Sequence, residues 1–205
     1  MTTAASLANA PVLIRPATAA DAPAIARVHV AAWQTTYRGL LPADFLAGLS
    51  VAERTARWAR RLSQESQPGG VFVAETADGQ IVGFVAGGAP QDDHPLRRVY
   101  RGELHAIYLL ADYQRQGIGR RLVRALAAAF QTAGLDSFFA WVLAENHPAR
   151  RFYAALGGQV VGERPITIAG LIEVVIGISA DAPNKRVFWS PWRRDRHGLN
   201  RLRFG

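Results

Sequence analysis

The segment from Glu103 to Val123 constrains the fold of this chain most, because it predicts a strand, a tight turn and a helix in direct succession. The turn carries Gln114-Arg-Gln-Gly117-Ile-Gly119. The helix that follows is predicted by apolar residues that recur every fourth position: Ile118, Leu122, Leu126 and Phe130. A chain with this segment is expected to build an α/β fold around it.

The turn between this strand and helix is suited to bind an anion. Several backbone N–H groups point at one spot there, at the positive end of the helix dipole. Gly117 and Gly119 lack the Cβ atoms that would keep a ligand away from the backbone. The expected occupant is a phosphate or pyrophosphate group.

Two common phosphate-binding motifs do not fit this turn. A Walker loop needs a lysine after its last glycine, and Lys185 is the only lysine in the chain. A dinucleotide-binding fingerprint needs a third glycine where this chain has Leu122, and no acidic residue ends the next predicted strand. Neither a Walker ATPase nor a Rossmann dehydrogenase is therefore expected.

The rest of the chain alternates strands and helices in the order β-α-α-β-β-β-α-β-α-β-β. Asp78-Gly79 between two apolar runs predicts a hairpin, and Ser50 followed by Glu53 predicts the start of a helix. With 205 residues, 49% of them hydrophobic, the chain is long enough for one well-packed domain. The absence of cysteine excludes disulfides, thiolate metal sites and a cysteine nucleophile.

The positive charge of the chain is concentrated at its end. Residues 181–205 hold seven arginines and lysines against two aspartates, so this segment supplies +5 of the net charge of +8. We therefore expect a single domain over residues 1–180 and a basic, aromatic-containing tail over 181–205. Phe188-Trp-Ser-Pro-Trp192 interleaves aromatic residues with the arginines, as in proteins that bind single-stranded nucleic acid. A flexible or subunit-docking arm is the preferred interpretation of this tail.

Three motifs together resemble the GCN5-related N-acetyltransferase (GNAT) family over residues 12 to about 179. They are Gln114-x-x-Gly117-x-Gly119 after an apolar strand, the mixed element order, and the block Asn146-x-x-Ala149-x-x-Phe152-Tyr153-x-x-Leu156-Gly157. Trp33-Gln-Thr-Thr-Tyr37-Arg-Gly-Leu-Leu-Pro42 is similar to a segment common in bacterial members. The resemblance implies an α/β (α+β) fold: a mixed, mostly antiparallel twisted sheet of about seven strands, flanked by about four helices and splayed between the fourth and fifth strands. Gly158 stands where the family usually has phenylalanine, which is expected to loosen the packing behind the site.

The resemblance also implies acetyl-CoA as the acetyl donor and assigns residues to it. The turn would hold the pyrophosphate, the strand backbone would run beside the pantetheine arm, and Asn146 would donate a hydrogen bond to that arm. The expected cofactor-binding residues are Ile107, Tyr108, Leu109, Gln114, Arg115, Gln116, Gly117, Ile118, Gly119, Arg120, Asn146 and Tyr153.

Glu103 and Tyr153 are the expected catalytic residues. Alternation along the strand places Glu103, His105, Ile107 and Leu109 on one face, so a Glu103 carboxylate near the thioester could accept the proton of the amine, directly or through water. His105 and water stay open as alternative bases. The family match makes Tyr153 the general acid for the departing thiolate, whereas its spacing alone would also fit a core aromatic residue.

The acceptor is expected to be a primary amine of a small molecule or peptide, bound near Trp33, Tyr37 and Glu103. Glu103 would favour a cationic amine. Direct attack in a ternary complex is expected, because no cysteine can carry the acetyl group. No metal site is expected, since the five histidines form no ligand pair.

Two other functions stay open: a non-catalytic acyl-CoA-binding sensor or scaffold, and a nucleic-acid-associated protein acting through the tail. The sequence lacks a signal peptide and an apolar run of about 20 residues, which predicts a soluble cytoplasmic protein without membrane contact. A homodimer also stays open, since members of the family are often dimers.

Overall fold

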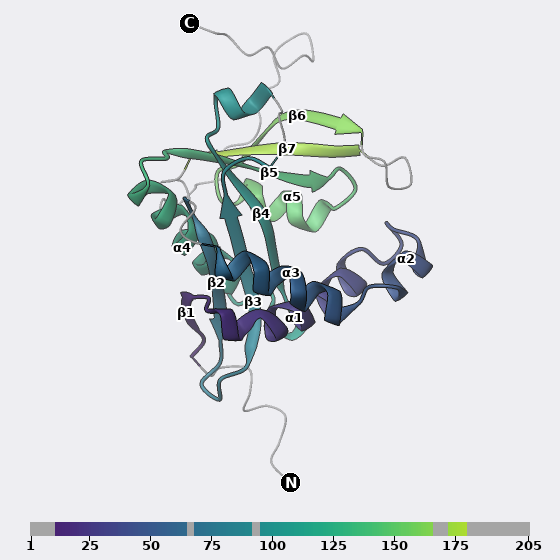
Figure 1. Cartoon of the computed structure of the whole chain (residues 1–205). Helices are drawn as coiled ribbons and strands as arrows, with labels where there is room; N and C mark the ends of the chain where they lie inside the picture. The colour runs from purple at the N-terminus through teal and green to yellow at the C-terminus, as the bar shows by residue number, and fades with distance from the viewer. Residues whose placement is uncertain (1–10, 65–67, 92–94, 166–171, 180–205) are drawn as a thin grey trace, which may run out of the picture.

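The computed structural model describes residues 11–64, 68–91, 95–165 and 172–179, and these residues form a seven-stranded sheet with helices on both faces (Figure 1). The basic segment 181–205 lies outside the described residues. The strand order is β1-β2-β3-β4-β5-β7-β6. The strands are β1 (Leu13–Pro16), β2 (Gly70–Glu75), β3 (Ile81–Gly88), β4 (Gly102–Leu109), β5 (Ser137–Leu143), β6 (Gln159–Pro165) and β7 (Ile172–Ser179).

The sheet is antiparallel except between β4 and β5. These two strands run parallel and pair over only three positions, Gly102–Leu104 with Phe138–Ala140. Beyond Leu104 the described ladder ends, and β4 continues toward Leu109 beside β3 alone. This confirms the predicted splay between the fourth and fifth strands, and it leaves one edge of the second half of β4 without a strand neighbour.

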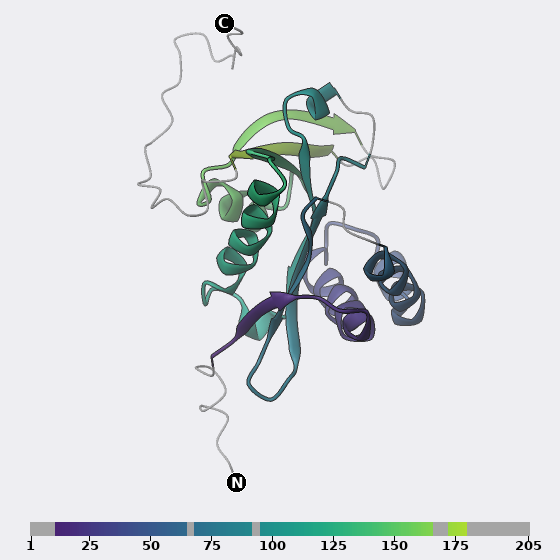
Figure 2. The ribbon, with the colours of Figure 1, turned by 60° about the vertical axis from the view of Figure 1, so that its left-hand side comes forward.

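Two layers of helices cover the sheet (Figure 2). On one face, α4 (Ile118–Thr132) packs on β2 and β3, and α5 (His147–Ala154) adds Tyr153 to the same apolar cluster. On the other face, α1 (Ala22–Thr36) packs on β3 and β4 and against α3 (Val51–Ser63), with the short α2 (Ala43–Ala47) at its end. Short 3₁₀ turns span Ala19–Asp21, Pro95–Arg98 and Ala111–Tyr113. The described chain thus has five α-helices where about four were expected.

The local signals in the sequence explain where these elements begin and turn. The Ser50 hydroxyl accepts a hydrogen bond from the Glu53 N–H at 3.2 Å and so begins α3. Gly79 turns the β2–β3 hairpin with φ of +84°, a conformation that a side chain disfavours. On α4, Leu122, Leu126 and Phe130 are fully buried against the sheet, as their spacing predicts.

The prediction that Gly158 loosens the packing is wrong. A Cβ atom at Gly158 would lie 2.7 Å from Ile176 Cγ2 and 2.9 Å from the carbonyl oxygen of Tyr153. The side chain of Ile176 on β7 therefore fills the space that a residue at 158 would need. The region behind α5 is tightly packed without the aromatic residue.

Asp21 is expected to make the stability of the fold sensitive to acid. The Arg15 guanidinium donates hydrogen bonds to its carboxylate at 2.8 and 2.9 Å, and this lowers the pKa of Asp21 from 3.8 to about 2. A lowered pKa in the folded state contributes stability above the ordinary pKa, and the contribution disappears as the pH falls from about 4 to about 2. Asp21→Asn should lower the free energy of unfolding by about 2 kcal/mol at pH 7 and flatten its dependence on pH in that window. Urea unfolding measures both effects, and Asp44→Asn at an exposed position of α2 should change neither.

Candidate active site

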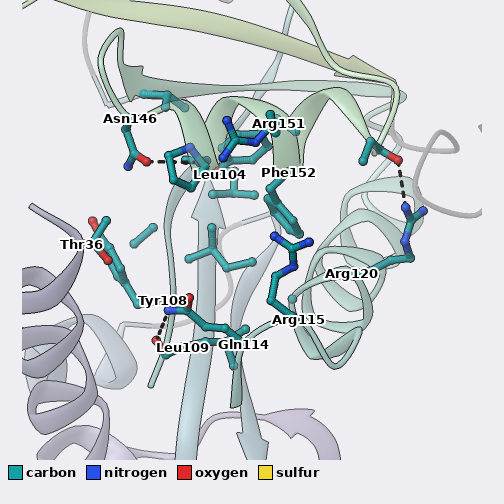
Figure 3. A pocket seen from close by; sticks show the side chains of 18 of the residues that line it. Thr36, Leu104, Tyr108, Leu109, Gln114, Arg115, Arg120, Asn146, Arg151 and Phe152 are labelled. Carbon is teal, nitrogen blue, oxygen red and sulfur yellow. Dashed lines mark hydrogen bonds between the residues drawn. The ribbon is translucent and has the colours of Figure 1, made fainter. Parts of the chain in front are cut away.

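A cavity of about 570 Å³ lies where β4 and β5 separate (Figure 3). Its walls come from β4, from Trp141 and Val142 on β5, from the turn before α4, from α5 and from the end of α1. A volume of this size is typical of a site for a small molecule or cofactor. The gap that the sheet leaves beside β4 is therefore the candidate site.

The turn between β4 and α4 has the backbone of an anion-binding nest. Arg115 has φ of +62° and Gly117 has φ of +79°, so left-handed residues alternate with others and turn successive N–H groups toward one side. The first N–H groups of α4 also lack an acceptor within their own helix. Side-chain amides brace the turn: Gln114 Nε2 donates to the Leu109 carbonyl at 3.2 Å and Gln116 Nε2 to the Asp112 carbonyl at 2.8 Å. The left-handed conformation of Arg115 is costly for a residue with a side chain, as is often found at ligand sites.

Both glycines of the turn line the cavity, and each keeps a different space open. A Cβ atom at Gly117 would meet nothing within 4 Å, whereas one at Gly119 would lie 3.2 Å from the Phe152 ring. The Phe152 ring can thus approach the start of α4 closely because residue 119 has no side chain. Glycine is needed at 119 because Phe152 approaches it closely, and it is favoured at 117 because of the positive φ.

Three arginines give this end of the cavity a positive charge. Arg115, Arg120 and Arg151 line it, and in Figure 3 Arg115 and Arg151 flank Phe152. Arg120 Nη2 donates to the Ala155 carbonyl at 2.9 Å, which ties the start of α4 to the end of α5. The cationic side chains and the nest of N–H groups together suit a ligand that carries several phosphates.

Asn146 and Tyr153 line the cavity from α5. Asn146 begins that helix: its Oδ1 accepts a hydrogen bond from the Ala149 N–H at 3.1 Å, which leaves the Nδ2 group to donate to a ligand. Tyr153 is buried, and the loss of water around it, with a smaller contribution from Tyr37, raises the pKa of its hydroxyl. Tyr153 therefore keeps its proton at neutral pH and can donate it.

The prediction that Glu103 shares a face with Ile107 and Leu109 is wrong. Glu103 pairs with Gly88 and Leu104 with Gly87, but Ala86 pairs with Ala106, so His105 is an extra residue in the ladder. This β-bulge turns Glu103 to the α1/α3 face, the face of Ala106 and Tyr108. Ile107 and Leu109 pack against the α4 cluster on the other face.

A buried polar cluster surrounds the bulge beneath α3. Arg61 Nη2 lies 2.7 Å from His105 Nδ1 and 3.2 Å from the Gly87 carbonyl, and His105 Nε2 lies 3.0 Å from the Ala89 carbonyl. Because a guanidinium only donates, His105 accepts at Nδ1 and carries its proton on Nε2. Burial and the Arg61 charge lower the pKa of His105 to about 4. Both ring nitrogens are thus occupied, which argues against His105 as the base.

Glu103 lies at the edge of this cluster. Its Oε2 accepts a hydrogen bond from the Gln91 N–H at 2.8 Å and lies 3.9 Å from His105 Nε2. Glu103 does not line the cavity itself, but Leu104 and the bulge residue His105 do. A water molecule would therefore be needed to connect its carboxylate with a reacting group.

Aromatic side chains form the wall on the α1 side. Tyr37 and Tyr108 line the cavity, and their hydroxyl groups lie 3.1 Å apart. Burial raises the pKa of Tyr108 well above its ordinary value, with a further contribution from Tyr37. Trp33 lies behind this wall, with its ring centroid 5.0 Å from that of Tyr37. Trp33 thus supports the wall and does not line the cavity.

The structure brings most of the predicted cofactor residues together. Those that line the cavity are Ile107, Tyr108, Leu109, Gln114, Arg115, Gly117, Gly119, Arg120, Asn146 and Tyr153. Gln116 braces the turn and Ile118 is buried in the core, so neither lines the cavity. Thr36, Trp141 and Arg151 line it but were not predicted. For Arg151 the sequence offered one signal, a positive charge two positions after Ala149 in the block that resembles the family.

Within the described part of the chain, no group of histidine, aspartate and glutamate side chains is arranged to hold a metal ion. The described helices also include none with the length and apolar character required to span a membrane.

Comparison with known proteins gives a consistent picture. Residues 33–157 match the acetyltransferase (GNAT) family. The chain is 37% identical to the uncharacterized N-acetyltransferase YuaI of Bacillus subtilis over 167 residues, which are 82% of this chain and 91% of that protein. The fold resembles the PaiA N-acetyltransferase of Thermoplasma acidophilum in complex with coenzyme A, with a TM-score of 0.64 at 18% identity over 82% of this chain and 99% of that one. It also resembles YncA of Salmonella typhimurium with its cofactor acetyl-CoA, with a TM-score of 0.62 at 19% identity over 89% and 99% of the two chains.

Proposed function

Because the chain belongs to the acetyltransferase (GNAT) family, we propose that this acetyl-CoA-dependent enzyme acetylates a primary amine of a small molecule or peptide by direct attack in a ternary complex. The observation that carries the proposal is the cavity at the β4–β5 splay, which joins the glycine turn to Tyr153.

The residues at the cavity fit coenzyme A. The N–H groups of the turn and the three arginines Arg115, Arg120 and Arg151 suit its phosphates. The exposed edge of β4 at Ile107–Leu109 and the Nδ2 group of Asn146 suit the amides of the pantetheine arm. When bound, acetyl-CoA supplies a thioester carbonyl that an amine can attack. A backbone N–H of β4 would then stabilise the charge that develops on the carbonyl oxygen.

Glu103 is the proposed base, and the β-bulge supports this role. The bulge turns the carboxylate to the face of Tyr37 and Tyr108, away from the α4 side of the sheet. An amine that enters on this face would pass its proton to Glu103 through a water molecule, and β4 would not lie between the two groups. Burial lowers the pKa of Arg61, and the negative charge of Glu103 partly opposes that shift, so the carboxylate and the guanidinium attract each other.

Tyr153 is the proposed acid. Its raised pKa keeps the hydroxyl protonated, so it can donate to the departing thiolate. Tyr153→Phe should lower kcat by about 10- to 100-fold and leave the KM for acetyl-CoA nearly unchanged, because a thiolate needs less assistance than most leaving groups.

Release of the coenzyme A thiol, followed with a thiol reagent at saturating acceptor, measures this effect. Tyr100→Phe removes the hydroxyl of another tyrosine whose pKa burial raises, one that does not line the cavity, and should leave kcat unchanged. Equal kcat values for the wild type and Tyr153→Phe would rule out the acid role.

Thiol release from acetyl-CoA in the presence of amines, amino acids, polyamines and peptides tests the function itself. Acceptor-dependent release, with an acetylated amine found by mass spectrometry, is the expected result. Tight binding of acetyl-CoA without turnover of any amine would instead favour the acyl-CoA-binding sensor or scaffold.

A further inference from the structure

Arg54 on α3 is a half-buried arginine whose guanidinium lacks an anionic partner in the described residues. Its Cζ atom lies 5.2 Å from the centre of the Trp33 ring. Burial, and to a smaller extent the charge of Arg57, lower the pKa of Arg54. Among the described residues, no side chain or carbonyl group accepts a hydrogen bond from it. The charge of its sequence neighbour Glu53 opposes the lowering of the pKa, but Glu53 forms no ion pair with Arg54.

The other arginines with withdrawn guanidinium groups are satisfied. Arg15 pairs with Asp21 and Glu75, and Arg61 contacts the Gly87 carbonyl and His105. Removing a charge from water without a partner is costly, and the stacking on Trp33 recovers only about 0.5–2 kcal/mol. Arg54 thus differs from these arginines in a way that a ligand would explain.

Arg54 lies on the side of the cavity from which the amine is proposed to enter. Trp33 connects it to the cavity wall, because its ring packs at 5.0 Å on Tyr37 and Tyr37 lines the cavity. Tyr108 lines the same wall, with its hydroxyl 3.1 Å from that of Tyr37. The Trp33 ring therefore contacts both the Arg54 guanidinium and Tyr37 of the cavity wall. Arg54 lies on the same face of the sheet as Glu103.

We propose that the acceptor carries a carboxylate as well as its amine, and that Arg54 binds this carboxylate while the amine enters the cavity beside Tyr37. This inference rests on the proposed function and names its substrate class: acidic amines such as amino acids. Glu103 alone would favour a cationic amine, but the Gln91 N–H already binds its carboxylate and the positive charge of Arg61 lies near it. Within the described chain, Arg54 is a cation on the acceptor side that makes neither an ion pair nor a hydrogen bond, and the charge of Glu53 acts on it only without direct contact.

Pairs of acceptors that differ only in the carboxylate test the inference. We would measure kcat/KM by thiol release for β-alanine against ethylamine and for 4-aminobutanoate against propylamine, with 1,4-diaminobutane as the cationic amine. The wild type should prefer the carboxylate-bearing member of at least one pair by about 10- to 100-fold, the range expected for a hydrogen bond between charged groups. Arg54→Met should lower kcat/KM for that acceptor by the same factor, and Arg54→Glu should shift the preference to the diamine.

Arg60→Met, at an exposed position of the same helix, is the matched control and should keep the preference. Thermal melting of each variant confirms folding, and the KM for acetyl-CoA should not change. A wild type without preference, or a preference that survives in Arg54→Met, would overturn the inference and leave the proposed function standing. The absence of turnover with every amine would overturn the proposed function, and this inference with it.

Discussion

Replacing Glu103 with glutamine should lower kcat by about 100- to 1,000-fold, the range in which a positioned base contributes. Glutamine keeps an oxygen that can accept the hydrogen bond from the Gln91 N–H, now 2.8 Å from Glu103 Oε2, so the bulge should persist. What is lost is the capacity to take a proton from the attacking amine. The remaining activity should rise with pH, because an amine that loses its proton in solution needs no base.

Thiol release at saturating acetyl-CoA and acceptor, from pH 6 to about 10, measures both effects. Glu163→Gln on β6 replaces an exposed acid that does not line the cavity and should behave like the wild type. A kcat within threefold of the wild type across the pH range would remove Glu103 from the mechanism. Water would then be the remaining candidate base, since Arg61 and the Ala89 carbonyl occupy both ring nitrogens of His105.

Replacing Gly119 with valine should raise the Kd for coenzyme A by at least about 100-fold. The Cβ atom alone would lie 3.2 Å from the Phe152 ring and 3.5 Å from Leu109 Cδ1, and both residues line the cavity. The two additional methyl groups must displace Phe152 or extend into the space above the turn. Either outcome disturbs the N–H groups at the start of α4, where charge-assisted hydrogen bonds to phosphate would be lost.

Isothermal titration calorimetry with coenzyme A measures this change. Gly134→Val, just beyond the opposite end of α4, is a demanding control: a Cβ atom there would meet nothing within 4 Å, and its φ of +73° makes the variant the more strained of the two. It should lower the melting temperature and leave the Kd unchanged. A Gly119→Val variant that binds coenzyme A as tightly as the wild type would show that the phosphates lie elsewhere.

The sequence was sufficient for the fold and for the half of the site that depends on local signals. The glycine turn, the helix face of Leu122 and Leu126, and the Asn146 cap are all local, because spacing and residue type determine them. The splay between β4 and β5 came from the family resemblance, and the short β4–β5 ladder confirms it.

The acceptor side could not be predicted, because it depends on register and on contacts between distant elements. Strict alternation placed Glu103 with Ile107, and one extra residue in the ladder reversed that assignment. The available signal was Gly87-Gly88 on the partner strand, since glycine inside a strand often marks a bulge or a close approach. A Cβ atom at Gly87 would lie 2.8 Å from Leu126, so close approach is the reason for that glycine. The position of Arg54 over Trp33 requires the packing of α3 on α1, which spacing alone does not give.

A crystal structure of the protein with coenzyme A bound tests the central claim most directly. The diphosphate should accept hydrogen bonds from the backbone N–H groups between Gly117 and Arg120, and the sulfur should lie within about 3.5 Å of the Tyr153 hydroxyl, in the gap between β4 and β5. Coenzyme A bound outside this gap, or with its sulfur far from Tyr153, would contradict the site and the roles proposed for its side chains.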